Sequence, residues 1–256
     1  MGKVIAVANQ KGGVGKTTTG INLAASLARS ARKVLLIDID PQGNATVGSG
    51  VDKEREDMTT IYDVLMDNEP AESAVVGTSN GFDLLPANGD LSGAQVELLD
   101  ELGRELRLKS ALASIRQSYD YILVDCPPSL NLLTVNALTA ADTVIIPMQC
   151  EYFALEGLTD LINTIKKIRE MLNPNLRIEG LLRTMYDGRN TLSTEVSEQL
   201  LAHFGSKVYH TIIPRNIRIA EAPSHGLPVF AYDATSKGAQ AYLALAGELL
   251  ERERAV

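Results

Sequence analysis

Short runs of consecutive apolar residues recur along the chain, and longer segments with apolar residues at helical spacing lie between them. The runs are rich in β-branched residues and do not alternate with polar ones, which is typical of strands buried on both faces. The predicted strands are residues 4–8, 33–40, 82–86, 119–125, 141–147, 176–185 and 211–214. Strands that alternate with helices in this way indicate βαβ units. We therefore expect an α/β fold with a doubly wound, mostly parallel sheet and helices on both faces.

The segments between the strands carry the signals of helices that pack on a sheet. Residues 59–67 have the form of a short capped helix, and Gly103 is expected to interrupt a longer helical segment. The predicted helices are residues 21–29, 59–67, 92–117, 155–171, 193–204 and 236–252. The 256 residues contain no repeat, low-complexity segment or long linker. We therefore expect residues 1–256 to form one domain.

The composition is ordinary for a water-soluble protein, with 45% hydrophobic and 22% charged residues. No window approaches the roughly 18 unbroken apolar residues of a membrane span. The N-terminal apolar run is short and leads directly into a glycine-rich segment, which does not fit a signal peptide. These features predict a cytoplasmic protein.

The net charge of -8 argues against a protein that covers nucleic acid with its whole surface. A local basic face, or one assembled from two subunits, is still compatible with this charge. Cys126 and Cys150 are far apart in the sequence. In a cytosolic protein we expect such thiols to be small buried residues rather than a disulfide or a metal site.

A glycine-rich segment at residues 9–19 connects the first predicted strand to the first predicted helix. Its three glycines allow backbone N–H groups to converge on an anion, and the following helix N-terminus adds partial positive charge. A lysine here would reach the terminal phosphates of a nucleotide, and the next threonine would place its hydroxyl on Mg²⁺. The residues expected to contact the nucleotide are Lys11, Gly12, Gly13, Val14, Gly15, Lys16, Thr17 and Thr18.

Carboxylates end two other predicted strands, at Asp38 and Asp40 and at Asp125. Ligands of doubly wound sheets bind beyond the carboxyl ends of the strands, so these groups should meet the glycine-rich loop at one site. Asp125 is expected to hold Mg²⁺ directly or through water. Asp38 and Asp40 should share one face of an extended strand, and the end of the strand could turn one of them toward the γ-phosphate. A carboxylate there can orient or deprotonate the attacking water. The alternative is that acidic residues simply end these strands.

The loop differs from the ordinary phosphate loop because Gln10 stands where its first glycine should be, and Lys11 follows. The sequence K-G-G-V-G-K-T-T resembles the deviant Walker A motif of ParA/MinD-type P-loop ATPases. Residues 38–44 resemble the second sequence element of ParA-type ATPases. Further similarity to chromosomal ParA (Soj) proteins extends over nearly the whole chain, at residues 147–158, 184–187, 213–216 and 221–226.

The resemblance implies a Mg²⁺-dependent ATPase that acts in DNA partitioning. It implies an ATP-bound homodimer in which Lys11 crosses to the nucleotide of the other subunit. It makes Asp40 the residue that sets up the hydrolytic water and puts Asp38 near the Mg²⁺ shell. Pro214 and Asn216, and more weakly Met185, become candidates for contact with the adenine.

The same resemblance implies binding to nonspecific double-stranded DNA, with nucleoid association in the ATP-bound state. A ParB-type partner protein would stimulate hydrolysis and release. Arg189, Arg215 and Arg218 are the DNA-binding candidates. Arg215 and Arg218 are three residues apart in a predicted short helix, so they should share a face. The alternative for each is an ordinary solvated arginine.

Two other functions share this type of nucleotide site. A MinD-like membrane-associated ATPase would need a C-terminal amphipathic helix, whereas residues 246–256 have mixed charge and no aromatic residue. No membrane partner is therefore expected. A redox protein similar to the nitrogenase iron protein would need two cysteines per chain, but Cys126 and Cys150 match that family's placement poorly. Relatives with kinase or ligase activity need an acceptor pocket, for which the sequence contains no signal.

Overall fold

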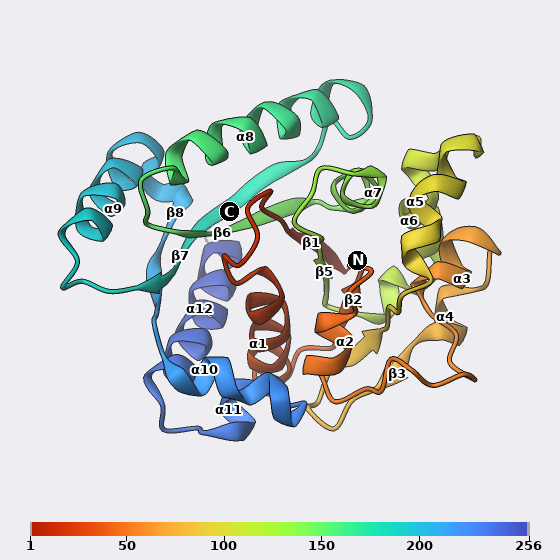
Figure 1. The fold of residues 1–256 in the computed structure, drawn as a ribbon, viewed down its shortest axis with the longest axis horizontal. Coiled ribbons are helices and arrows are strands. Elements are labelled where there is room, and N and C mark those ends of the chain that lie inside the picture. The colour runs from red at the N-terminus through yellow and green to blue at the C-terminus, as the bar shows by residue number, and fades with distance from the viewer. Residues whose placement is uncertain (1, 255–256) are drawn as a thin grey trace.

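The computed structural model describes residues 2–254, so the first residue and the last two residues of the expected domain lie outside it. Its eight strands form one sheet in the order β3-β4-β2-β5-β1-β6-β7-β8 (Figure 1). All neighbouring strands are parallel except β3 and β4. The strands are β1 (Lys3–Val7), β2 (Val34–Asp38), β3 (Val76–Gly77), β4 (Asp83–Leu85), β5 (Tyr121–Asp125), β6 (Thr143–Gln149), β7 (Arg177–Tyr186) and β8 (Val208–Pro214). The expected doubly wound α/β fold is confirmed.

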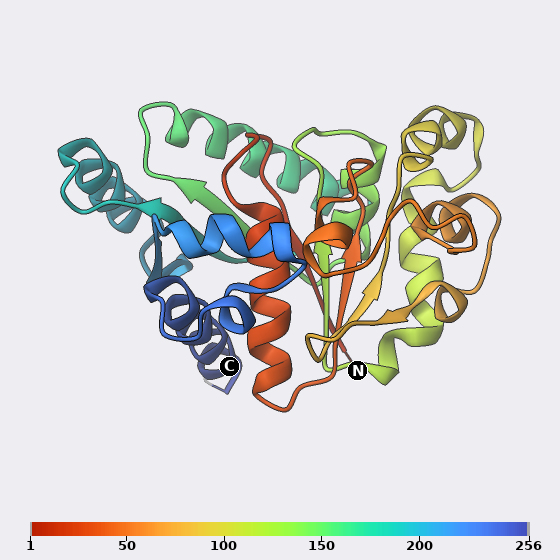
Figure 2. The same cartoon turned by 60° about the horizontal axis from the view of Figure 1, so that its bottom comes forward.

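Helices cover both faces of the sheet (Figures 1 and 2). Buried residues of α1, α2, α11 and α12 belong to the core on one face, and those of α3 to α9 to the core on the other. The helices are α1 (Lys16–Arg29), α2 (Asn44–Gly48), α3 (Ile61–Met66), α4 (Ala71–Ala74), α5 (Leu91–Glu97), α6 (Arg107–Ile115), α7 (Leu132–Ala140), α8 (Ala154–Met171), α9 (Thr191–Phe204), α10 (Ile217–Glu221), α11 (Val229–Tyr232) and α12 (Lys237–Arg254). Five single 3₁₀ turns connect some of them, at Leu98–Asp100, Arg104–Leu106, Arg116–Ser118, Gly205–Lys207 and Ala222–His225.

The central strands are apolar throughout because successive side chains enter the two different cores. In β1, Val4 and Ala6 pack in the core of α3 to α9, while Ile5 packs in the core of α1 and α12. β2 alternates in the same way at Leu35 and Leu36. This arrangement explains why continuous apolar runs, rather than alternating ones, mark the strands in the sequence.

Helix α3 begins as the sequence predicts. The Thr60 hydroxyl accepts from the backbone N–H of Tyr62 at 3.2 Å, and the Asp63 carboxylate accepts from the backbone N–H of Thr60 at 2.6 Å. This reciprocal pair is a capping box, and it satisfies two N–H groups that a helix start leaves free. The capped helix expected at residues 59–67 is confirmed.

The interruption expected at Gly103 is confirmed: the helical segment expected at 92–117 is divided into α5 and α6, and Gly103 lies between them with φ 67°. Other elements were not predicted. Helix α7 was not expected because almost every one of its residues is buried, which removes the amphipathic pattern that marks a surface helix. Helices α2, α4 and α11 and strand β3 were not expected either, since each has only two to five residues.

The C-terminal helix α12 packs its apolar side against α1 and β8, with Tyr242, Leu245 and Leu249 buried. That side is therefore used within the fold. Within residues 2–254, no helix combines the length and apolar character needed to cross a membrane.

Candidate functional site

The glycine-rich loop lies at the centre of the carboxyl edge of the sheet. It follows β1, which has β5 on one side and β6 on the other, and it leads into α1. Gly13 and Gly15 have φ of 72° and 85°, in the left-handed region that glycine adopts without strain. The N–H of Thr19 donates to the Gly15 carbonyl at 2.9 Å and starts the helix. The loop therefore presents free backbone N–H groups and a helix N-terminus to the same space.

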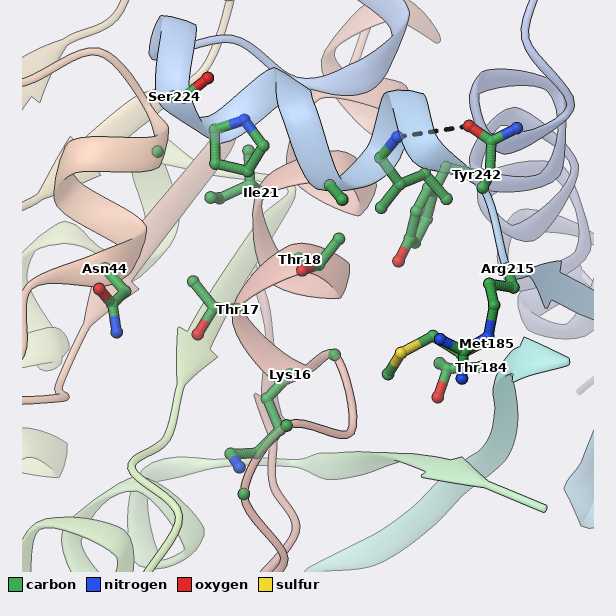
Figure 3. A pocket seen from close by; sticks show the side chains of 18 of the residues that line it. Lys16, Thr17, Thr18, Ile21, Asn44, Thr184, Met185, Arg215, Ser224 and Tyr242 are labelled. Carbon is green, nitrogen blue, oxygen red and sulfur yellow. Dashed lines mark hydrogen bonds between the residues drawn. The ribbon is translucent and has the colours of Figure 1, made fainter. Parts of the chain in front are cut away.

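A cavity of about 690 Å³ opens at this edge (Figure 3). We call its two parts the phosphate end and the far end. The phosphate end is lined by Gly12, Gly13, Gly15, Lys16, Thr17, Thr18, Asp40 and Pro128. The far end is lined by Ile21, Asn44, Val47, Gly48, Thr184, Met185, Pro214, Arg215, Asn216, Ile219, Ala220, Pro223, Ser224 and Tyr242. The cavity thus brings together the loop, the end of β2 and the C-terminal segment, as expected for a nucleotide site.

Lys16 is the cationic group within the phosphate end. Its side chain is 6% exposed, and its Nζ donates to the Lys11 carbonyl at 3.1 Å. Burial lowers the pKa of Lys16, and the charge of Asp125 opposes that change. A buried ammonium whose hydrogen-bonding capacity is mostly unused is suited to bind phosphate oxygens.

Asp38 and Asp125 are register partners on β2 and β5, and both are fully buried. The Oδ2 of Asp38 accepts from the backbone N–H and the hydroxyl of Thr46, both at 2.8 Å. Its Oδ1 accepts from the N–H of Asp40 at 3.1 Å. Asp125 differs, because neither of its carboxylate oxygens has a hydrogen-bond partner. Burial raises the pKa of Asp38 to about 6.

Burial and the charge of Asp38 raise the pKa of Asp125 well above its ordinary value, against smaller opposing effects of Thr17 and Lys16. A buried carboxylate without a partner is costly unless it meets a cation. Mg²⁺ in nucleotide sites is held by one or two protein oxygens together with phosphates and waters. Asp125 and the neighbouring hydroxyl of Thr17 therefore fit a magnesium ion, whereas the oxygens of Asp38 are already occupied by Thr46 and Asp40.

Asp40 is placed differently from the sequence prediction. Strand β2 ends at Asp38, and Asp40 lies in the turn that follows, so the two carboxylates do not share a strand face. The reason is the hydrogen bond from the N–H of Asp40 to Asp38, a local turn that competes with the strand. As a result Asp40 reaches the cavity, while Asp38 does not line it.

Lys11 and Val14 belong to the loop, but they do not line the cavity. The side chain of Val14 is buried, and its carbonyl accepts from the Thr184 hydroxyl at 2.8 Å. The Nζ of Lys11 instead forms an ion pair with Glu151 at 2.5 Å, and both side chains are about half exposed. Lys11 is therefore directed away from the phosphates that its own loop would bind.

The far end combines apolar side chains from several helices and strands. Met185 has φ 48°, an unusual conformation for a residue other than glycine, and its sulfur accepts from Gln149 at 2.9 Å. Asn216 caps α10, since its Oδ1 accepts from the N–H groups of Arg218 at 2.9 Å and Ile219 at 3.3 Å. Met185, Pro214 and Asn216 all line the cavity, as the base-site expectation requires.

Sequence reasoning missed much of this end. Ile21 lies one helical turn beyond Thr17 and Thr18, so it lies on the same face of α1. This spacing was the signal by which the sequence could have placed Ile21 in the cavity. Tyr242 has no such signal: its ring reaches the cavity from α12, and its hydroxyl lies 3.3 Å from that of Thr19 on α1. The remaining unexpected residues of the far end come from α2, from the end of β7 at Thr184 and from the segment 217–224.

The three candidate DNA-binding arginines lie in different surroundings. Arg215 precedes α10 and lines the cavity, so the prediction that it shares a helix face with Arg218 is wrong. The reason is that Asn216 caps the helix and leaves Arg215 outside it. Arg218 pairs with Glu221 at 2.8 Å and Asp233 at 3.4 Å. Arg189 pairs with Asp187 at 2.7 Å.

Both cysteines are free and buried, as expected. Burial raises the pKa of Cys126 and of Cys150, the latter to about 11. With exposed fractions of 1% and 4%, neither thiol is at the surface, where a cluster shared by two subunits would require it. His225 stacks on Tyr232 with ring centroids 4.9 Å apart.

Known proteins are similar to this chain in sequence and architecture. A family model described as an AAA domain (AAA_31) matches residues 2–178. The chromosome partitioning protein ParA of Caulobacter vibrioides (strain NA1000 / CB15N) is 55% identical over 255 residues, 98% of this chain and 95% of that protein. The sporulation initiation inhibitor protein Soj of Bacillus subtilis (strain 168) is 53% identical over 250 residues, 97% of this chain and 98% of that protein.

A solved structure is also similar over nearly the whole length. The crystal structure of cobyrinic acid a,c-diamide synthase from Mycobacterium smegmatis with bound ADP and magnesium has a TM-score of 0.88 and 40% sequence identity. The match covers 99% of this chain and 96% of that chain.

Proposed function

This chain belongs to the ParA/Soj family of partitioning ATPases, and from that premise we propose that two copies hydrolyse ATP between them to control their hold on DNA. The chain is a Mg²⁺-dependent ATPase of that family. The observation that carries the proposal is the composition of the phosphate end. A buried lysine and a carboxylate line this end, and a second, fully buried carboxylate without a hydrogen-bond partner lies next to Lys16 and Thr17.

In the proposed site, the loop N–H groups and Lys16 bind the phosphates of ATP. Thr17 and Asp125 would hold the magnesium ion, with Asp38 beside Asp125 on the neighbouring strand. When bound, the ion supplies positive charge that neutralises charge developing on the phosphate oxygens. Binding also removes the cost of the two buried carboxylates, because their repulsion is then offset by a cation.

Asp40 orients and accepts a proton from the attacking water. It is the carboxylate of the β2 end that lines the cavity, and the N–H of Gln42 donates to its Oδ1 at 3.0 Å. That hydrogen bond fixes the carboxylate while leaving capacity for a water molecule.

Hydrolysis is completed by Lys11 of a second copy. In this chain Lys11 lies outside its own cavity and is held by Glu151 on the surface. An exposed ion pair is worth little, so exchanging Glu151 for a phosphate of the facing subunit has a small cost. A cation that crosses an interface in this way stabilises transition-state charge as an arginine finger does.

The ATP-bound dimer binds double-stranded DNA without reading its sequence, through phosphate contacts of Arg189, Arg215 and Arg218. In the single chain, Arg189 and Arg218 are already paired with carboxylates, so DNA must compete with these partners. Such competition agrees with an acidic protein that binds DNA only in its ATP-bound dimeric state. A ParB-type partner then stimulates hydrolysis and release.

One measurement tests the function as a whole: ATP turnover with neither, either or both of duplex DNA and the partner protein. We expect low basal turnover and stimulation that requires the partner. Binding of ATP-loaded protein to arbitrary duplex should weaken steeply with salt, with a slope of about -0.9 per phosphate contact. Absence of ATP-dependent DNA binding at low salt would contradict the proposal.

The contribution of Lys11 across the interface can be tested by mixing variants. Lys11→Ala and Asp40→Ala should each lose stimulated turnover alone. In a mixed dimer, one of the two sites has both an intact Lys11 from one subunit and an intact Asp40 from the other, so part of the activity should return. If mixing restores nothing while the mixed dimers form, Lys11 does not act across the interface.

The name of the Mycobacterium smegmatis neighbour describes a different reaction. That neighbour is 40% identical to this chain, whereas the partitioning relatives are 55% and 53% identical. Partitioning therefore remains the function that the chain supports best.

A further inference from the structure

A second hollow lies away from the nucleotide cavity and is lined mainly by apolar side chains. We call it the α7–α8 groove. It has a volume of about 310 Å³ and lies between residues 99–105, residues 130–135 at the start of α7, and residues 167–172 at the end of α8. Figure 1 shows α7 close to the teal end of α8. None of its lining residues belongs to the nucleotide cavity.

The groove is surrounded by large apolar side chains that remain exposed. Leu99, Leu130 and Met171 line it and are 55%, 45% and 80% exposed. Leu102 and Leu106, from the same segment as Leu99, are 95% and 40% exposed. Single exposed leucines are normal, but a cluster of them around a concave surface marks an interaction site.

The charge of the groove indicates what kind of group it would receive. Among its charged lining residues, Arg104 and Glu105 pair with each other at 3.1 Å. Lys167, the third, forms no ion pair within residues 2–254. The first turn of α7, which also lines the groove, contains no acidic residue. The unpaired lysine and the helix N-terminus both favour a negative charge in the groove.

We propose that the α7–α8 groove docks an amphipathic helix of another protein, whose apolar ridge enters the groove and whose carboxylate meets Lys167. A helix fits because its side chains at i, i+3, i+4 and i+7 form a ridge that a concave apolar surface can bury. A lipid bilayer fits this concave surface less well, because a bilayer takes up side chains that protrude from a convex surface. A second copy of this chain would have to present an equivalent acidic ridge.

This docking surface does not depend on the proposed nucleotide chemistry, because the two sites share no residue. Its test therefore uses the full chain without nucleotide. The probe is a displayed library of 18-residue peptides, selected at physiological salt for binding to the wild-type protein, followed by synthesis of the enriched peptides and titration by fluorescence anisotropy.

Two variants and two matched controls locate the binding. Met171→Glu and Lys167→Glu change the exposed groove lining. Lys166→Glu alters the adjacent lysine on the same helix, which does not line the groove, and Leu201→Glu alters an exposed leucine on α9. All four positions are at the surface, so the variants should fold.

We expect enriched peptides with apolar residues at helical spacing and at least one acidic residue. Their affinity should fall by about tenfold or more in Met171→Glu and Lys167→Glu, and by less than about twofold in both controls. Equal binding to Met171→Glu would overturn the proposal. So would enrichment of peptides without acidic residues.

Two further measurements test whether the α7–α8 groove binds something other than a helix. Sedimentation with vesicles of phosphatidylcholine and phosphatidylglycerol tests a lipid surface, and sedimentation velocity tests a second copy. If Met171→Glu abolishes vesicle binding or self-association while no peptide binds the groove, the helix proposal is wrong.

Discussion

The two ends of the nucleotide cavity hold their ligand by different physical means. The phosphate end uses charge: Lys16, Asp40 and the loop N–H groups line it, and Asp125 lies buried behind it. The far end uses shape, because its lining is largely apolar and comes from α1, α2, α12, the end of β7 and the segment 214–224. In a site that excludes water, a single charged group makes a strong interaction with the ligand. Shape complementarity instead adds up many weak van der Waals contacts. Substitutions at the two ends should therefore differ in size and in kind.

Removing Lys16 should have the largest effect. In Lys16→Ala we expect ATP hydrolysis to fall by about 10³-fold or more, because one preorganised charge at the phosphates is lost. Turnover and equilibrium binding of ATP are the measurements. Lys33→Ala, an exposed lysine on the same chain, is the control and should behave as wild type. Near-normal hydrolysis in Lys16→Ala would show that Lys16 does not bind the phosphates of ATP, and the assignment of the phosphate end would be wrong.

Removing Asp40 should slow chemistry and leave binding intact. In Asp40→Asn we expect turnover to fall by about 10²-fold or more while ATP affinity changes little, since proton acceptance is lost. Asparagine can still accept from the N–H of Gln42, so the turn should be retained. Asp40→Ala, which loses that hydrogen bond, separates the chemical role from the structural one. Unchanged turnover in both variants would contradict the role of Asp40.

The buried carboxylates should make the nucleotide-free protein sensitive to pH. The pKa of Asp38 is raised from its ordinary value to about 6, so the native state binds more protons than the unfolded state between about pH 4 and 6. Stability therefore falls as pH rises through this window. The pKa of Asp125, which burial and the charge of Asp38 also raise, adds to the same trend.

Asp125→Asn should relieve this repulsion without losing a hydrogen bond, because Asp125 makes none. We expect its Tm at pH 8 to exceed that of the wild type by about 2–6 °C, a gain of roughly 1–2 kcal/mol. Asp52→Asn is the exposed control. Mg²⁺ with ATP should stabilise the wild type and not the variant. A lower Tm for Asp125→Asn would show that the carboxylate is not repelled in the folded state.

At the far end the expected effects are small. Asn216→Ala loses the cap of α10 and any contact of the amide with the base, whereas Asn216→Asp can keep the cap. If the amide N–H₂ binds the base, KM for ATP should rise by about 3- to 10-fold in both variants with little change in kcat. If only Asn216→Ala is affected, Asn216 acts through the helix and not through the base. If an Asn216 variant lost as much ATP hydrolysis as Lys16→Ala, the two ends of the cavity would not differ in this way.

The phosphate end was predictable because its groups lie in one contiguous stretch or at the ends of recognisable strands. The sequence alone indicated Lys16, Thr17 and Asp125, and the structure brings these segments together. It misplaced Asp40 relative to Asp38, because the turn closed by the hydrogen bond from the N–H of Asp40 to Asp38 competes locally with the strand. The far end was only partly predictable, because residues such as Tyr242 reach it through the packing of α12 on α1.

By itself, the sequence determined the α/β class, the loop between β1 and α1, and the acidic residues at the strand ends. These features depend on local hydrophobic patterns and on backbone hydrogen bonding within a few residues. Only the tertiary structure decided which carboxylate remains without partners, which arginines are already paired and where an apolar groove is left open. These depend on strand register and on contacts between distant segments, which local sequence does not encode.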